Sequence, residues 1–130
     1  MRELYDLAAE IGETLKARGE KIAVNESSSG GLISAALLSV PGASAYYLGG
    51  AVVYTPKARV LLTDIPREAL EGMRSSSEPY AQLLARNARE RYGAAWGISE
   101  TGESDRQANM LAFAMASLSL LKRALEAVEA

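Results

Sequence analysis

The feature that most constrains the fold is a short apolar run that ends abruptly in serines and glycines, V-N-E-S-S-S-G-G, at residues 24–31. Gly19 precedes the run, and apolar residues follow it at helical spacing over 32–40. This order predicts a buried strand, a tight connection and a helix. Because glycine permits tight turns and the close approach of a ligand, we expect the N–H groups of residues 29–32 to form an unpaired first helical turn. Such a turn favours an anion or a developing oxyanion.

A simpler interpretation is that Ser27 or Ser28 is only the N-cap of the helix and that the glycines serve the connection. The run matches neither G-x-x-x-x-G-K-[ST] nor G-x-G-x-x-G, so it predicts no nucleotide fingerprint. The chain contains no histidine. A Ser-His-Asp triad within the chain is therefore excluded.

Three motifs occur in a fixed order between Asn25 and Arg59: E-S-x-x-G-G, V-P-G and G-G-x-V-x-Y. In this combination the run resembles the C-terminal domain of the CinA family, the nicotinamide-nucleotide amidohydrolases. The resemblance is close over the first half of the chain and looser over the rest. It implies an α/β fold, a three-layer α/β/α sandwich of the CinA C-terminal type.

The resemblance also implies an activity: hydrolysis of the carboxamide of nicotinamide mononucleotide to nicotinic acid mononucleotide and ammonia, with a serine nucleophile, a lysine base and no cofactor. The serine that follows Glu26 in the motif is Ser27, which would attack the amide carbon. Tyr54 matches a family tyrosine, and the family lysine five residues later falls on Arg59.

The exchange at Arg59 matters because a guanidinium keeps its proton and cannot accept one from a serine hydroxyl. Arg59 can instead stabilise an oxyanion or hold a phosphate. Lys57 or Tyr54 would then have to move the proton. If residues 55–63 are helical, Lys57 and Arg59 point in directions about 200° apart, so Lys57 cannot simply replace Arg59.

The predicted site therefore has two groups of residues. The catalytic candidates are Ser27, Tyr54, Lys57 and Arg59. Ser28 and Ser29 fall on a cysteine and a threonine of the family motif, Thr101 and Gly102 keep a threonine-glycine pair, and Arg106 matches the start of the last helix. Arg106 has an alternative role, pairing with Glu103 or Asp105 on the surface. The substrate-binding candidates are Ser28, Ser29, Gly30, Gly31, Thr101 and Arg106.

Composition limits the remaining possibilities. The chain has 130 residues, the size of one domain, and its net charge of −2 gives no basic footprint for nucleic acid. Without cysteine or histidine we expect no transition-metal site and no disulfide. No apolar stretch approaches a membrane span, and residues 1–10 are too acidic for a signal peptide. We expect a cytoplasmic protein that binds a small nucleotide substrate.

Periodicity and helix-starting prolines predict helices over 3–18, 29–40, 56–62, 66–73, 78–92 and 105–129, and periodicity predicts strands over 21–24, 51–53 and 94–99. About 30 residues that the family has after Gly102 are missing near 102–105, which leaves three strands where sheets typically have five or six. Either they are deleted, or a disordered loop has been left out.

The last helix carries apolar residues on two faces, which needs two partners and predicts a homo-oligomer. Three functions remain open: an amidohydrolase, a nucleotide-binding relative without turnover, and an oligomerising structural module.

Overall fold

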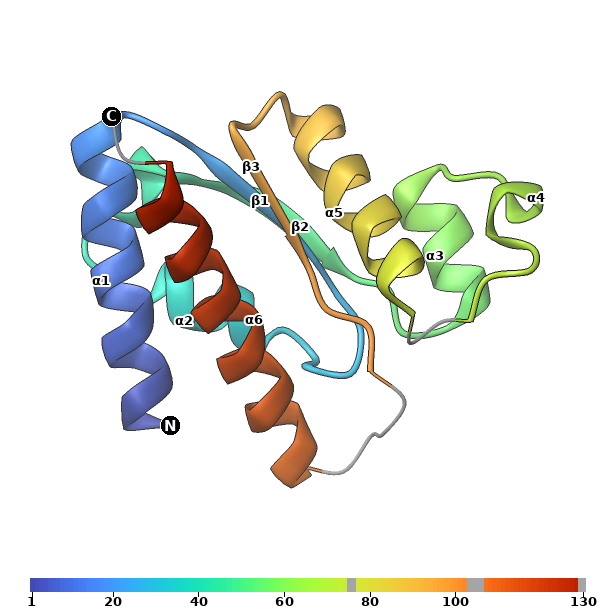
Figure 1. Cartoon of the computed structure of the whole chain (residues 1–130), viewed down its shortest axis with the longest axis horizontal. Helices are drawn as coiled ribbons and strands as arrows, with labels where there is room; N and C mark the ends of the chain where they lie inside the picture. The colour runs from blue at the N-terminus through green and yellow to red at the C-terminus, as the bar shows by residue number, and fades with distance from the viewer. Residues whose placement is uncertain (75–76, 103–106, 129–130) are drawn as a thin grey trace.

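The structure is a computed structural model that describes residues 1–74, 77–102 and 107–128. Three parallel strands form its sheet, β1 (Ile22–Glu26), β2 (Tyr47–Val52) and β3 (Trp96–Ser99), in the order β2-β1-β3. β1 is central, and all five of its residues are buried. The carboxyl ends of the three strands therefore meet at one edge of the sheet, where Figure 1 shows the loops that follow β1 and β3.

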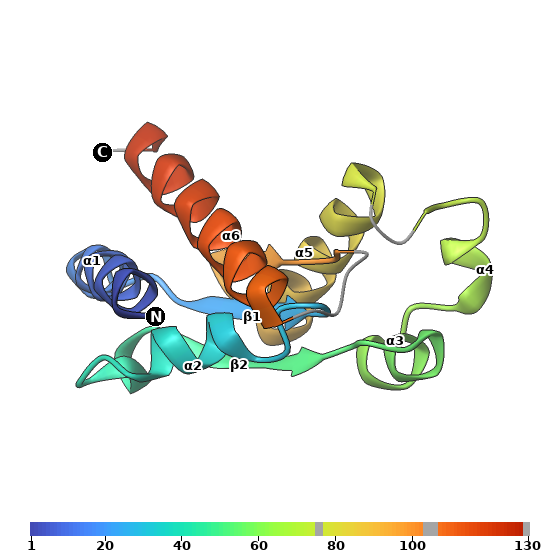
Figure 2. The same cartoon turned by 90° about the horizontal axis from the view of Figure 1, so that it is seen from below.

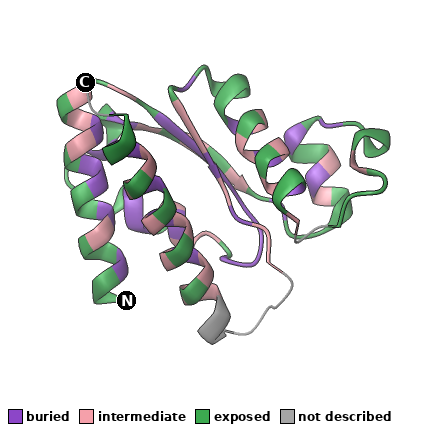
Figure 3. Cartoon of the chain, viewed as in Figure 1, coloured by how far each residue is buried: buried purple, intermediate pink, exposed green. Residues whose placement is uncertain are grey.

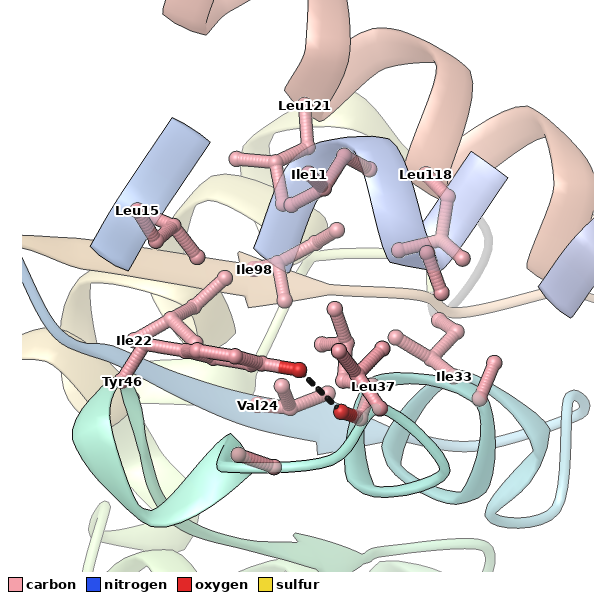
Figure 4. Packing of buried hydrophobic residues seen from close by; sticks show 14 of the residues in the cluster. Ile11, Leu15, Ile22, Val24, Ile33, Leu37, Tyr46, Ile98, Leu118 and Leu121 are labelled. Carbon is pink, nitrogen blue, oxygen red and sulfur yellow. Dashed lines mark hydrogen bonds between the residues drawn. The ribbon is translucent and has the colours of Figure 1, made fainter. Parts of the chain in front are cut away.

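Helices cover both faces of the sheet. On one face α1 (Arg2–Arg18), α2 (Leu32–Leu38) and α6 (Gln107–Ala127) enclose the main core, and Figure 4 shows Leu15, Ile33 and Leu118 packed over Val24 and Ile98. On the other face α5 (Glu78–Tyr92) packs along β1 and β3. The short α3 (Pro56–Thr63) and α4 (Arg67–Leu70) lie at the end of the molecule opposite α1 (Figures 1 and 2). The predicted α/β/α sandwich is confirmed.

The helix ends follow the local sequence. α1 stops at Gly19, which adopts the left-handed backbone conformation with φ of 65°. α5 begins at Ser77, whose side chain accepts a hydrogen bond from the N–H of Tyr80, with Pro79 in the first turn. Along these helices, buried residues lie on the face toward the core and exposed residues on the opposite face (Figure 3).

The strand boundaries differ from the sequence-based expectation in all three strands, and β3 begins at Trp96 where position 94 was expected. β1 continues through Asn25 and Glu26, and β2 starts at Tyr47 and includes Gly49 and Gly50. A Cβ atom at Gly50 would lie 2.1 Å from the carbonyl oxygen of Val24. The glycines therefore allow close approach inside the sheet, where turn chemistry alone suggested a break.

The last helix has the two predicted faces. Leu118, Leu121 and Leu125 are buried in the core, whereas Leu120 on the other face is 60% exposed. No second chain is present, so homo-oligomerisation stays a prediction. We expected family residues to be missing near 102–105. Most of that position, residues 103–106, lies outside the described residues. No helix in the described ranges has the length and apolarity needed to cross a bilayer.

Candidate active site

Ser27 and Arg59 meet at the carboxyl edge of the sheet. Ser27 directly follows β1, and Arg59 lies on α3, which begins soon after β2 with Thr55 as its N-cap and Pro56 in the first turn. The Arg59 Nη2 donates to Ser27 Oγ at 3.3 Å, and its Nε donates to the carbonyl of Val53 at 3.0 Å. Ser27 is 2% exposed and Arg59 is 7% exposed. The structure thus places the guanidinium against the predicted nucleophile.

Several buried polar groups hold Arg59 in this position. Its guanidinium lies over the ring of Tyr80, 5.1 Å from the ring centroid. Thr63 donates its hydroxyl to the carbonyl of Arg59, and the Asn87 amide donates to the carbonyl of Thr63. Asn25 on β1 donates in turn to Asn87 at 3.3 Å. This chain of hydrogen bonds ties α3 and α5 to the central strand, and so fixes the distance between Arg59 and Ser27.

On the opposite side of the loop the carboxylate of Glu26 caps α2. It accepts hydrogen bonds from the N–H groups of Gly31 at 3.1 Å, Ile33 at 3.0 Å and Ser34 at 2.8 Å. The carboxylate thus satisfies three backbone donors at the start of the helix and lies at its positive end. Neither Ser27 nor Ser28 caps the helix, so that alternative is wrong.

Glu100, one residue beyond β3, closes the loop from the other strand. Its Oε1 accepts from the N–H groups of Ser27 at 2.9 Å and Ser29 at 2.7 Å. The hydroxyl oxygen of Ser29 lies 2.7 Å from Oε1 of both Glu26 and Glu100. Within the described part of the chain, Oε2 of Glu100 has no hydrogen-bond partner, although Glu100 is only 6% exposed. Two carboxyl groups thus share one serine hydroxyl inside the protein.

The expected unpaired first turn at residues 29–32 is therefore wrong. The N–H of Ser29 donates to Glu100 and that of Gly31 to Glu26, while Gly30 and Leu32 donate to the carbonyls of Ser27 and Ser29. The N–H of Ser28, in contrast, has no acceptor among the described residues. Because Ser28 directly follows Ser27, its amide is the better backbone candidate for an oxyanion at this loop.

The other predicted site residues take different places. Ser28 Oγ donates to the carbonyl of Gly102 at 3.0 Å, which brings the loop next to half-buried Thr101. Tyr54 is 49% exposed at the end of β2. Lys57 is exposed on α3, and the helix turns it away from the direction of Arg59. Arg106 lies outside the described residues. The structure therefore joins Ser27 with Arg59 but does not bring Lys57 to them.

The described side chains at this site do not form a metal centre. Among residues 1–74, 77–102 and 107–128, no group of three or more carboxylate, imidazole or thiol side chains could hold a metal ion. The carboxyl groups of Glu26 and Glu100 are instead occupied by backbone N–H groups and the hydroxyl of Ser29.

Known proteins resemble this chain in both sequence and fold. The profile of the CinA C-terminal domain matches residues 4–110. The chain belongs to this family. A CinA-like protein of Anaeromyxobacter dehalogenans is 44% identical over 100 residues, which are 77% of this chain and 24% of the relative. A CinA-like protein of Synechocystis is 38% identical over 96 residues, 74% of this chain and 23% of the relative. The chain thus spans about a quarter of the length of these relatives.

Solved structures agree with this assignment of the fold. The competence/damage inducible protein CihA of Agrobacterium tumefaciens superposes with a TM-score of 0.85 at 24% identity, covering 95% of each chain. A CinA superfamily protein of Klebsiella pneumoniae gives a TM-score of 0.77 at 19% identity over 94% of each chain. At these identities the likeness concerns the fold.

Sequence reasoning missed four residues that shape the site. Glu26 had a usable signal, because an acidic side chain just before a helix start can accept hydrogen bonds from the first N–H groups. Glu100, Tyr80 and Asn87 carried no such signal. They reach the site from α5 and from the residue after β3, about 50 or more positions away in sequence from the loop at 27–31.

Proposed function

We propose that this chain is an amidohydrolase that uses Ser27 to hydrolyse the carboxamide of nicotinamide mononucleotide. The observation that carries the proposal is the hydrogen bond of 3.3 Å from Arg59 to the hydroxyl of Ser27 at the end of the central parallel strand. Family membership supports the same reaction. Reactive groups in open α/β sheets gather at such strand ends.

The residues at this edge suit the attack and the charge that it creates. Ser27 Oγ would form a bond to the amide carbon, while the carbonyl oxygen becomes an oxyanion that Arg59 and the N–H of Ser28 can stabilise. Departure of the amide nitrogen as ammonia leaves an acyl-serine, and water then hydrolyses it to the carboxylic acid. The Ser27 proton has to reach the leaving nitrogen through some acceptor.

The described residues provide no such proton acceptor at Ser27. Arg59 is the only hydrogen-bond partner of Ser27 Oγ within the described residues, and a guanidinium cannot accept the proton. We therefore propose slow turnover. Arg59 specifically favours a second candidate, a nucleotide-binding protein without turnover, since a fixed cation at the serine binds anions well and activates the serine poorly.

Ammonia release from nicotinamide mononucleotide, measured beside thermal stabilisation by the same nucleotide, tests the two candidates. For the amidase we expect slow release that disappears in Ser27→Ala, with the melting temperature of the variant close to that of wild type. Stabilisation without any release supports the binding protein. Release that persists unchanged in Ser27→Ala contradicts the assignment of the nucleophile.

A further inference from the structure

Among the residues that the structure describes, Arg59 is a buried cation without an anionic partner. In residues 1–74, 77–102 and 107–128, no carboxylate forms an ion pair with its guanidinium, although only 7% of the residue is exposed. Its neighbours are the neutral groups of Ser27, Val53 and Tyr80. Burying a charge without compensation is costly, so this arrangement favours a bound anion.

The guanidinium also has donors to spare. Of its five N–H bonds, the described residues use one on Nε and one on Nη2, so Nη1 donates to none of them. Arg59 lines an open cavity of about 220 Å³ together with Tyr80 and the exposed side chains of Arg67 and Glu71. Arg59 therefore contacts Ser27 through its guanidinium and is also one of the residues that line an open cavity.

We propose that Arg59 makes this a carboxylate-binding site, which holds a pyridine-3-carboxylate, the acid that amide hydrolysis yields, more tightly than the corresponding carboxamide. The inference rests on the proposed function for the identity of the ring. A planar guanidinium matches the two oxygens of a carboxylate, whereas a carboxamide offers one oxygen and a competing NH₂ donor. We assign Arg59 to the carboxylate at the reacting carbon and not to the phosphate of the nucleotide, because Arg59 contacts the nucleophile Ser27 itself.

The test compares binding of nicotinic acid mononucleotide and nicotinamide mononucleotide by calorimetry. The two ligands differ only at the carboxyl carbon, and a Ser27→Ala background keeps the amide from being consumed. A charge-assisted hydrogen bond predicts about ten- to hundredfold tighter binding of the acid. Adding Arg59→Gln should abolish this preference, and adding Arg59→Lys should reduce it, since lysine offers a point charge without the fork.

Arg67→Gln is the matched control, because it removes an exposed guanidinium from the same cavity and should leave the acid preference intact. Equal affinity for the two ligands overturns the proposal, as does a preference that survives Arg59→Gln. Arg59→Gln weakening both ligands equally would assign the guanidinium to the phosphate and would also overturn it. Should Arg59→Gln not fold, Arg59→Lys decides: an undiminished preference then overturns the proposal.

The outcome is separable from the proposed activity. Tighter binding of the acid without ammonia release in the wild type supports the carboxylate site and contradicts the amidase. Ammonia release without any acid preference supports the amidase and overturns the carboxylate site.

Discussion

The two sides of the loop at residues 27–31 differ in how their charges are satisfied. Facing α2, the carboxylates of Glu26 and Glu100 accept five backbone N–H groups and share the hydroxyl of Ser29. Facing α3, the guanidinium of Arg59 has neutral hydrogen-bond partners and unused donors as far as the described residues go. The first side resembles a structural hydrogen-bond network, and the second resembles a binding site for an anionic ligand.

The difference has a physical reason. Leaving a buried donor without a partner costs about 1–3 kcal/mol, so a loop rich in N–H groups needs acceptors in order to fold. The carboxylate of Glu26 supplies them at the positive end of α2. An Arg59 that has no anionic partner in the described part of the chain opposes folding, and it is tolerated in the way that strained or unsatisfied groups are tolerated at functional sites. We therefore expect substitutions on the first side to change stability and those on the second to change chemistry.

The largest effect should follow from Arg59→Lys. A positioned base contributes on the order of 10² to 10⁴ in rate, and a buried lysine can accept the proton that a guanidinium cannot. Ammonia release from nicotinamide mononucleotide should therefore rise by at least about tenfold. Steady-state rates under saturating substrate measure this.

Lys57→Ala separates this prediction from its competitor. If Lys57 were already the base, Lys57→Ala would abolish release and Arg59→Lys would add little. Its exposed position on α3 predicts no such loss. If neither substitution changes a readily measurable rate, both assignments of the base fail, and Tyr54 becomes the better candidate.

Next in size is the loss of stability in Glu26→Ala. The variant leaves the N–H groups of Gly31, Ile33 and Ser34 without their acceptor, which predicts a fall of about 3 kcal/mol or more in the free energy of unfolding. Urea unfolding followed by circular dichroism measures it. Glu13→Ala, at an exposed position on α1, should change it little. If Glu26→Ala lowers the free energy of unfolding by less than Arg59→Gln does, the expected difference between the two sides is contradicted.

The smallest effect should come from Glu100→Gln. The amide keeps an acceptor for the N–H groups of Ser27 and Ser29, and it removes one of two carboxyl groups that share the hydroxyl of Ser29. Removing a buried like charge should raise the free energy of unfolding by about 1 kcal/mol. The same urea titration checks this. A clear decrease would show that the unpartnered Oε2 of Glu100 carries a needed charge.

Sequence reasoning reached Ser27 and Arg59 by way of a motif. The spacing of E-S-x-x-G-G and G-G-x-V-x-Y is local, and it fixed which residues follow two neighbouring parallel strands. It failed at Gly49 and Gly50, because a glycine that ends a strand and a glycine that admits a close neighbour look identical in sequence. Only the carbonyl of Val24, 2.1 Å from where a Cβ atom of Gly50 would lie, shows which applies.

The sequence by itself determined the fold class and the family, through motifs that resemble the CinA C-terminal domain, and it indicated Ser27 and Arg59 as residues of one site, because short motifs mark strand ends and helix starts. Tertiary structure alone decided which groups the loop donates to. The acceptors of residues 27 and 29 come from Glu100, and the groups that hold Arg59 come from α5. Hydrogen bonds between segments this far apart depend on how the strands are ordered in space, and no local pattern records that order.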